Sequence, residues 1–240
     1  RLAGKPLIVY KLGKSELAQE LAKSHTGALA GSDAAFNAFL KHNGIARVDQ
    51  FETLIEVPNL FRKHKKNSQK RVGVVTTTGG GGAMVIDSLS NLGVDIVAPG
   101  LKISDFLKKY NIGYSGSKLI DLTIAGTKPE IVSNVIGLLM EKSDIDLVLM
   151  VVGSSAKFKP DQAVEPLIKW KDNSKPLAVY IAPDAPDALK MLNENKIAGF
   201  RTPEGCADGI NSFLNSSEIK LLPNKIMSKI HIELEKLLCF

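Results

Sequence analysis

His25 is the residue of this chain best suited to group transfer. Imidazole can be poised near neutral pH, where it accepts a group as a nucleophile and passes it on. Gly27 and Gly31 follow it, and glycines let backbone amides close around an anion because no Cβ is in the way. A lone histidine at a helix end is more often a capping or surface group, yet Ser24 and Thr26 add hydroxyl groups on either side. The segment therefore predicts a histidine that is transiently phosphorylated.

Four consecutive glycines end the segment TTTGGGG at 76–82, directly after an apolar run that predicts a buried strand. At the carboxyl end of a parallel strand, the free amides and positive dipole end of the next helix form an anion site. A tight strand-to-helix turn is the simpler explanation, but four glycines cost more backbone entropy than such a turn needs. The G-x-G-x-x-G spacing of a dinucleotide site is not met. We expect phosphate to bind at Thr78, Gly79, Gly80, Gly81 and Gly82.

Other chemistries are not supported by the spacing of residues. The segment GKS at 13–15 lacks the first glycine of a P-loop, because Ile8 stands at that position. Cys206 and Cys239 have no CxxC spacing, and no histidine has a second ligand at metal spacing. No G-x-S-x-G nucleophile elbow occurs. We expect no metal site and no disulfide framework.

Composition narrows the class of protein. The 240 residues carry a formal net charge of +6, with 44% hydrophobic and 6% aromatic residues. Basic residues are not interleaved with aromatics, so we expect no nucleic-acid partner. No run reaches the roughly 18 apolar residues of a membrane span, and no signal peptide is present, so we expect a cytoplasmic protein without membrane contact. Because the chain opens on Arg1, we expect a piece of a longer polypeptide.

Short β-branched runs alternate with amphipathic segments along the chain. The runs are continuously apolar, which is typical of strands buried on both faces of a parallel sheet. Strands are expected at 6–12, 46–48, 72–77, 94–97, 147–152 and 177–181. Helices are expected at 15–23, 32–42, 82–92, 129–141, 161–170, 186–195 and 204–214. This alternation predicts an α/β fold with flavodoxin-like, doubly wound parallel sheets.

A polar, basic stretch at 64–70 predicts a linker. Residues 1–66 then form the last part of a flavodoxin-like domain that carries the histidine. Their strands are too few for a sheet of their own, so the sheet edge needs a partner. Residues 70–222 form a second flavodoxin-like domain, and 223–240 a terminal helix with an apolar face.

Several segments share the pattern of one enzyme family. They are KLGKSE at 11–16, SHTGALAGSD at 24–33, TTTGGGG at 76–82 and GFRTPE at 199–204. Together they resemble the signature of the ADP-forming (nucleoside-diphosphate-forming) acyl-CoA synthetases, which are relatives of succinyl-CoA synthetase. The resemblance spans nearly the whole chain, and the SHTGALAGSD match is highly specific.

The resemblance implies a succinyl-CoA ligase-like fold and an acid–thiol ligase. Such an enzyme interconverts acyl-CoA, ADP and phosphate with a carboxylic acid, CoA and ATP. In the family an acyl phosphate phosphorylates the histidine that maps onto His25, and a mobile loop carries the phosphohistidine to an ATP-grasp module. By the same resemblance, Thr26 and Gly27 would shape the loop and contact phosphate, and the glycine run would hold the phosphate at a helix end. The cofactors implied are CoA, ATP or ADP with Mg, and phosphate.

The family's CoA-binding and ATP-grasp domains have no counterpart in this sequence. The expected partners are therefore those domains or subunits, a carboxylic acid or acyl-CoA substrate, and further copies in a homo- or hetero-oligomer, and the fragment alone should be inactive. Thr77 replaces the family's asparagine, Gly81 replaces its proline, and only Asp121 and Leu122 remain of its N-P-V-D-L segment. The alternative is a non-catalytic module that senses CoA or acyl-CoA for a fused acetyltransferase. Retention of His25 favours the synthetase.

Overall fold

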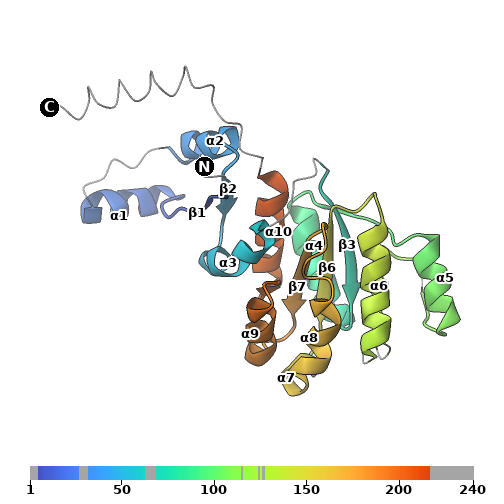
Figure 1. Cartoon of the computed structure of the whole chain (residues 1–240). Coiled ribbons are helices and arrows are strands. Elements are labelled where there is room, and N and C mark those ends of the chain that lie inside the picture. Colours follow the sequence, from blue (N-terminus) through green and yellow to red (C-terminus); the bar gives the residue numbers. More distant parts are fainter. Residues whose placement is uncertain are drawn as a thin grey trace.

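The computed structural model describes residues 5–26, 32–62, 69–114, 116–123, 125 and 128–216. These residues form a two-stranded and a six-stranded sheet, with helices packed around the larger one (Figure 1). Within the described residues, no helix has the length and apolar character needed to span a membrane.

The large sheet is wholly parallel. Its strands are β3 (Arg71–Thr76), β4 (Asp95–Ile96), β5 (Leu119–Asp121), β6 (Leu147–Val152), β7 (Leu177–Ile181) and β8 (Ala198–Phe200). Their order is β4-β3-β6-β7-β8, and β5 pairs with the carboxyl half of β3 on the side of β4. Chain order therefore reverses between β3 and β6, as in flavodoxin-like sheets.

Helices cover both faces of this sheet, which is why β6 and β7 are buried at every position. One face packs against α4 (Gly79–Asn91) and α10 (Pro203–Asn215). The other packs against α5 (Leu101–Lys109), α6 (Pro129–Glu141), α8 (Pro160–Ile168) and α9 (Pro186–Glu194), as Figure 1 shows. Successive residues of β6 alternate between the hydrophobic cores on the two faces of the sheet. Leu149 and Val151 lie in the core beneath α4 and α10, and Met150 and Val152 lie in the core beneath α5, α6, α8 and α9.

The amino-terminal segment adds a small sheet. Its elements are β1 (Ile8–Tyr10), α1 (Glu16–Thr26), α2 (Asp33–His42), β2 (Ala46–Val48), α3 (Phe51–Glu56) and the 3-10 helix η1 (Val57–Phe61). β1 and β2 pair in parallel. Val48, Val57 and Leu60 are buried in the same core as α10, so β2 and η1 pack directly onto the large domain. The division of the chain near 64–70 stays a prediction.

Most elements lie where the sequence predicts them, and β2, β6, β7 and α6 have the expected bounds. The short strands β5 and β8 and the helices α5 and α7 (Ser155–Phe158) were not predicted. β5 and β8 contain three residues each and exist because they pair with β3 and β7, which no local pattern reveals. The expected terminal helix at 223–240 lies outside the described residues.

Candidate functional site

The predicted phosphate turn joins β3 to α4. β3 ends at Thr76 and α4 begins at Gly79, so only Thr77 and Thr78 lie between them. The Thr76 hydroxyl donates to the carbonyl oxygen of Thr78 at 2.8 Å and accepts the Thr78 N–H at 2.9 Å. These two bonds hold the turn between β3 and α4 in a tight conformation.

The amino end of α4 has free backbone donors. Thr78 is the N-cap, in an extended conformation, and its side chain makes no capping hydrogen bond. The N–H of Gly82 donates to the Thr78 carbonyl at 2.9 Å and so belongs to the helical ladder. The N–H groups of Gly79, Gly80 and Gly81 precede that bond and are the ones available to an anion. The Gly82 N–H is used inside the helix, so the prediction that phosphate binds at this turn depends on the other three glycine amides.

Packing explains part of the glycine run. A Cβ on Gly81 would lie 2.9 Å from the Cβ of Ala182, and one on Gly82 would lie 3.0 Å from a methyl group of Leu119. A Cβ on Gly80 would meet nothing within 4 Å. Packing against Ala182 therefore accounts for Gly81, whereas a side chain at Gly82 would need a small shift of the Leu119 side chain. Gly80 faces open space, and packing does not explain it.

A carboxylate shares this end of α4. A Cβ on Gly79 would lie 2.9 Å from Oδ2 of Asp121, the last residue of β5. The other oxygen of Asp121, Oδ1, accepts hydrogen bonds from the N–H and the hydroxyl of Thr123, both at 2.9 Å. A negative charge at this position is favoured by the helix dipole. Asp121 is not among the site residues predicted from the sequence, although its retention within the family's N-P-V-D-L segment was a signal for it.

The predicted nucleophile lies on α1. This helix is longer than expected and ends at Thr26, so the backbone of His25 is helical. In the preceding turn the Ser24 hydroxyl donates to the Leu21 carbonyl oxygen at 2.8 Å. The side chains of His25 and Thr26, and the whole of Gly27, lie outside the described residues. Figure 1 shows α1 well apart from α4, with α3 and α10 between them in this view, so the structure does not bring the two predicted halves of the site together.

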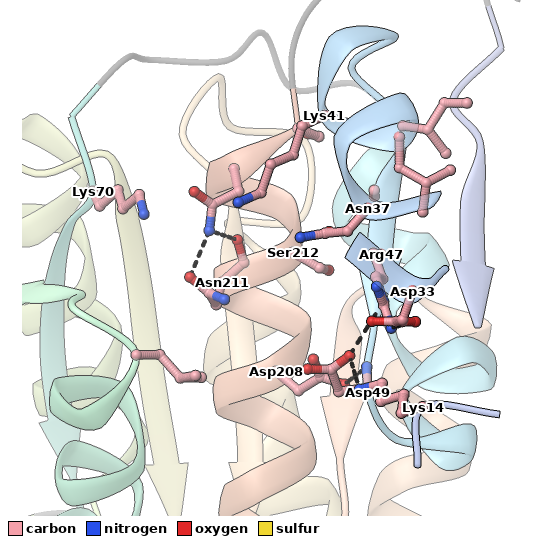
Figure 2. A pocket seen from close by; sticks show the side chains of 16 residues that line it. Lys14, Asp33, Asn37, Lys41, Arg47, Asp49, Lys70, Asp208, Asn211 and Ser212 are labelled. Atoms are coloured by element: carbon pink, nitrogen blue, oxygen red, sulfur yellow. Dashed lines mark hydrogen bonds and ion pairs between the residues drawn. The ribbon is translucent and has the colours of Figure 1, made fainter. Parts of the chain in front are cut away.

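A buried carboxylate on α10 holds the amino-terminal segment in place. Asp208 accepts hydrogen bonds from the N–H groups of Asp49 at 2.8 Å and Gln50 at 3.0 Å. Figure 2 shows Asp208 beside Asp49. Gln50 is the N-cap residue of α3, so Asp208 supplies the cap that the Gln50 side chain does not. Burial raises the pKa of Asp208, and the two backbone hydrogen bonds partly oppose that rise.

The GFRTPE segment also has a structural role. Arg201 pairs with Glu56 of α3 at 2.6 Å, and Thr202 caps α10 by accepting the Gly205 N–H at 3.0 Å. Burial is the main cause of a raised pKa of Glu56, and the charge of Arg201 opposes it. The segment that resembles the family therefore fixes α3 against the start of α10.

A polar cleft of about 450 Å³ lies between the α2–β2 region and α10 (Figure 2). Asp33 is paired with Arg47 at 2.8 Å and with Lys11 at 3.5 Å, and Asp49 is paired with Lys14. The hydrogen bond from Arg47 is the main cause of a lowered pKa of Asp33. These ion pairs all join residues of the amino-terminal segment, so they hold β1, α2 and β2 to one another. Over the part of the chain that the structure describes, no group of three or more His, Cys, Asp or Glu side chains is arranged to hold a metal ion.

Comparison with known proteins places this geometry in context. The family described as the succinyl-CoA ligase like flavodoxin domain matches residues 1–61. The alpha subunit of ADP-forming acetate–CoA ligase I of Pyrococcus furiosus is 28% identical over 226 residues, which are 90% of this chain and 48% of that subunit. The ADP-forming acetate–CoA ligase of Methanocaldococcus jannaschii is 35% identical over 104 residues, 43% of this chain and 14% of that protein.

A solved structure has the same fold. The dinucleotide-forming acetyl-coenzyme A synthetase 1 of Ca. Korarchaeum cryptofilum, in complex with phosphate and ADP, matches with a TM-score of 0.72 and 24% identity. The match covers 88% of this chain and 47% of that chain. The chain thus spans half or less of the length of these relatives. The succinyl-CoA ligase-like α/β fold and the resemblance to ADP-forming acyl-CoA synthetases are confirmed.

Proposed function

We propose that this chain, a relative of the ADP-forming acyl-CoA synthetases, supplies the phosphohistidine and one phosphate-holding helix end of such an enzyme. The complete enzyme would interconvert acyl-CoA, ADP and phosphate with a carboxylic acid, CoA and ATP. The observation that carries the proposal is the open amino end of α4, where the Thr78 side chain makes no cap and Gly80 faces open space. Because the remaining halves of the relatives have no counterpart here, the CoA and nucleotide sites belong to partner domains or subunits.

The proposed reaction has three steps. Phosphate attacks the thioester carbonyl of acyl-CoA, which releases CoA and leaves an acyl phosphate. A nitrogen of neutral His25 then attacks the phosphorus atom, the P–O bond to the acyl group breaks, and the carboxylate leaves. Transfer of the same phosphoryl group to ADP gives ATP and restores the imidazole. CoA and ADP with Mg supply the thiol and the final acceptor when they are bound.

The chain's own residues contribute position and charge. The N–H groups of Gly79, Gly80 and Gly81 would donate to the phosphoryl oxygens, and the positive end of α4 would favour their charge. Phosphoryl transfer depends mainly on positioning and electrostatic stabilisation, so oriented amides suit it. Thr26 and Gly27 would shape the segment that presents His25. Because α1 and α4 lie apart here, the mechanism requires the His25 segment to move or to be repositioned by its partners.

Labelling tests the proposal directly. The complete synthetase is incubated with ATP that carries a labelled γ-phosphate, and the chain is isolated and digested. The label should be acid-labile, base-stable and located on His25, and it should be lost on addition of CoA and the correct acid. Undiminished label in a His25→Ala variant would rule out this role. A His42→Ala variant is the matched control, because His42 lies at the end of α2 and should not affect labelling.

The non-catalytic alternative predicts binding of CoA or acyl-CoA without any label. The relatives reported above are ligases, which does not favour a sensing module.

A further inference from the structure

A second cavity opens beside the predicted phosphate turn, on the opposite face of the sheet from α4. Its volume is about 290 Å³. The residues that line it come from the ends of β3 and β6 and from α6, α7 and α8, and its floor and walls include Thr77, Val132, Met150, Val152, Phe158 and Ala163. None of the residues predicted from the sequence to bind phosphate lines it.

The position of this cavity follows from the strand order. β3 and β6 are neighbours, but β3 is followed by α4 on one face, whereas β6 is followed by α7 and α8, and α8 packs on the other. Connections that leave a parallel sheet on opposite faces open a crevice at the carboxyl ends of the two strands, where ligands of such folds bind. The cavity lies at this point of reversal.

The floor of the cavity is apolar and fixed. Met150 and Val152 of β6 are 1% and 3% exposed, and Val132 of α6 is 2% exposed. These side chains belong to the closely packed core of this face, so the floor is preformed. Phe158 stands at the rim and is 80% exposed, which gives the mouth a further apolar surface.

The polar end of the cavity is directly connected to the phosphate turn. Thr77 lines the cavity, and its hydroxyl accepts the Gly153 N–H at 3.0 Å, which ties the end of β3 to the end of β6. The next residue, Thr78, is the N-cap of α4. Adjacent Cα atoms are about 3.8 Å apart, so a ligand can place an apolar group in the cavity and a negative group near the turn. Lys159, exposed at the mouth, adds a positive charge.

We propose that this cavity holds the side chain of the carboxylic acid and selects an aryl or medium-chain acid over acetate. The inference rests on the proposed function. An apolar cavity of about 150 Å³ accommodates a benzene ring, so about 290 Å³ has room for a ring or a chain of about six carbons. Each methylene group buried there should tighten binding about fourfold. Acetate would leave most of this surface in contact with water.

Direct binding tests the inference without catalysis. Acetate, hexanoate and phenylacetate are titrated into the chain, and dissociation constants are measured by calorimetry or ligand-observed NMR. Hexanoate and phenylacetate should bind at least tenfold tighter than acetate. Hexanol should bind more weakly than hexanoate if the turn and Lys159 recognise the carboxylate. Equal affinity for acetate and hexanoate would overturn the proposal.

Two variants on α8 locate the site. Ala163→Leu adds bulk at the cavity wall and should weaken hexanoate at least tenfold, whereas Glu165→Leu places the same side chain on α8 at an exposed position that does not line the cavity and should have no effect. Circular dichroism and a melting curve check that both variants fold. If Ala163→Leu misfolds, Ala163→Val gives a smaller fill of the same wall. Folded wall variants with unchanged hexanoate affinity would place the binding elsewhere and refute the inference.

The result of the acid-binding experiment can be distinguished from the result of the labelling experiment. Acid binding in the cavity does not use the imidazole, so His25→Ala should bind hexanoate as tightly as the parent chain. Label on His25 without acid binding would refute the cavity proposal alone. Acid binding that depends on Ala163, without any label, would refute the phosphohistidine and leave the cavity as a carboxylic-acid site.

Discussion

Asp208 accepts a hydrogen bond from the backbone N–H of Asp49 at 2.8 Å, although the two residues are 159 positions apart. The carboxylate also accepts the N–H of Gln50 and so caps α3 from a different part of the chain. This contact, with the Glu56–Arg201 pair, attaches the segment that carries the predicted nucleophile to the domain that carries the predicted phosphate turn. These polar contacts act together with the apolar contacts of Val48, Val57 and Leu60, which are buried in the same core as α10.

Removal of the Asp208 carboxylate should loosen this attachment. In Asp208→Ala two backbone N–H groups lose their acceptor, so we expect a loss of about 2–4 kcal/mol in the free energy of unfolding. Amide hydrogen exchange should increase first in α3 and η1. The control is Asp105→Ala on the exposed face of α5, which should stay within about 0.5 kcal/mol of the parent chain. Unchanged exchange in α3 would contradict the capping role.

Asp208 should also make the stability of the folded chain depend on pH. Burial raises the pKa of Asp208, so the folded chain binds this proton more tightly than the unfolded chain, in which the pKa is about 3.9. The contribution of Asp208 to stability is therefore complete below about pH 3.9 and is lost as the pH rises through the raised pKa. Urea unfolding at several pH values should show the parent chain losing stability relative to Asp208→Asn over that window.

The pH dependence of stability that Asp33 contributes should have the opposite sign to that of Asp208. Its pKa is lowered, chiefly by the hydrogen bond from Arg47, so its contribution is present above the unfolded pKa and is lost as the pH falls. Relative to Asp33→Asn, the parent chain should lose stability on acidification. If the two variants gave differences of the same sign, one of the two assignments would be wrong.

Substitutions in the glycine run should separate packing from binding. In Gly81→Ala the new methyl group would meet Ala182 and Thr78 at 2.9 Å, so we expect a loss of about 1–3 kcal/mol in stability. In Gly80→Ala the methyl group meets nothing, and stability should rise by up to about 1 kcal/mol because alanine favours the helix. The same methyl group stands where phosphate would bind, so labelling of His25 in the complete enzyme should fall at least tenfold. Full labelling of Gly80→Ala would argue against phosphate at this helix end.

Asp121 should limit the affinity of α4 for anions. Its carboxylate lies beside Gly79, and two like charges at such a distance repel. We expect Asp121→Asn to bind inorganic phosphate several-fold more tightly, measured by phosphorus NMR, while helix stability falls by about 0.5–1 kcal/mol through loss of the favourable dipole contact. Asp95→Asn, in which the lost charge pairs with Lys118, is the control. Weaker phosphate binding in Asp121→Asn would indicate that the carboxylate helps to orient the anion instead.

The sequence predicted what local chemistry determines. Continuously apolar runs such as 147–152 give buried parallel strands because both of their faces need cover. The histidine and glycine segments indicated phosphoryl chemistry, because imidazole and free amides are intrinsic to those residues. The resemblance to the acyl-CoA synthetases followed from the same segments and is confirmed, whereas the roles of His25 and of the glycine run remain predictions.

Tertiary structure decided which residues meet. Strand pairing and helix packing bring Gly81 against Ala182 and Asp121 to the amino end of α4. They also place Met150 and Val132 on the floor of one cavity. Each of these contacts joins residues that no sequence window contains, and β5 itself exists only because it pairs with β3. The sequence by itself determined the reactive groups and the type of sheet, since both depend on neighbouring residues. Only the folded chain decided which amides are free, which charge opposes an anion and where an apolar ligand has room, because these depend on the distances between distant segments.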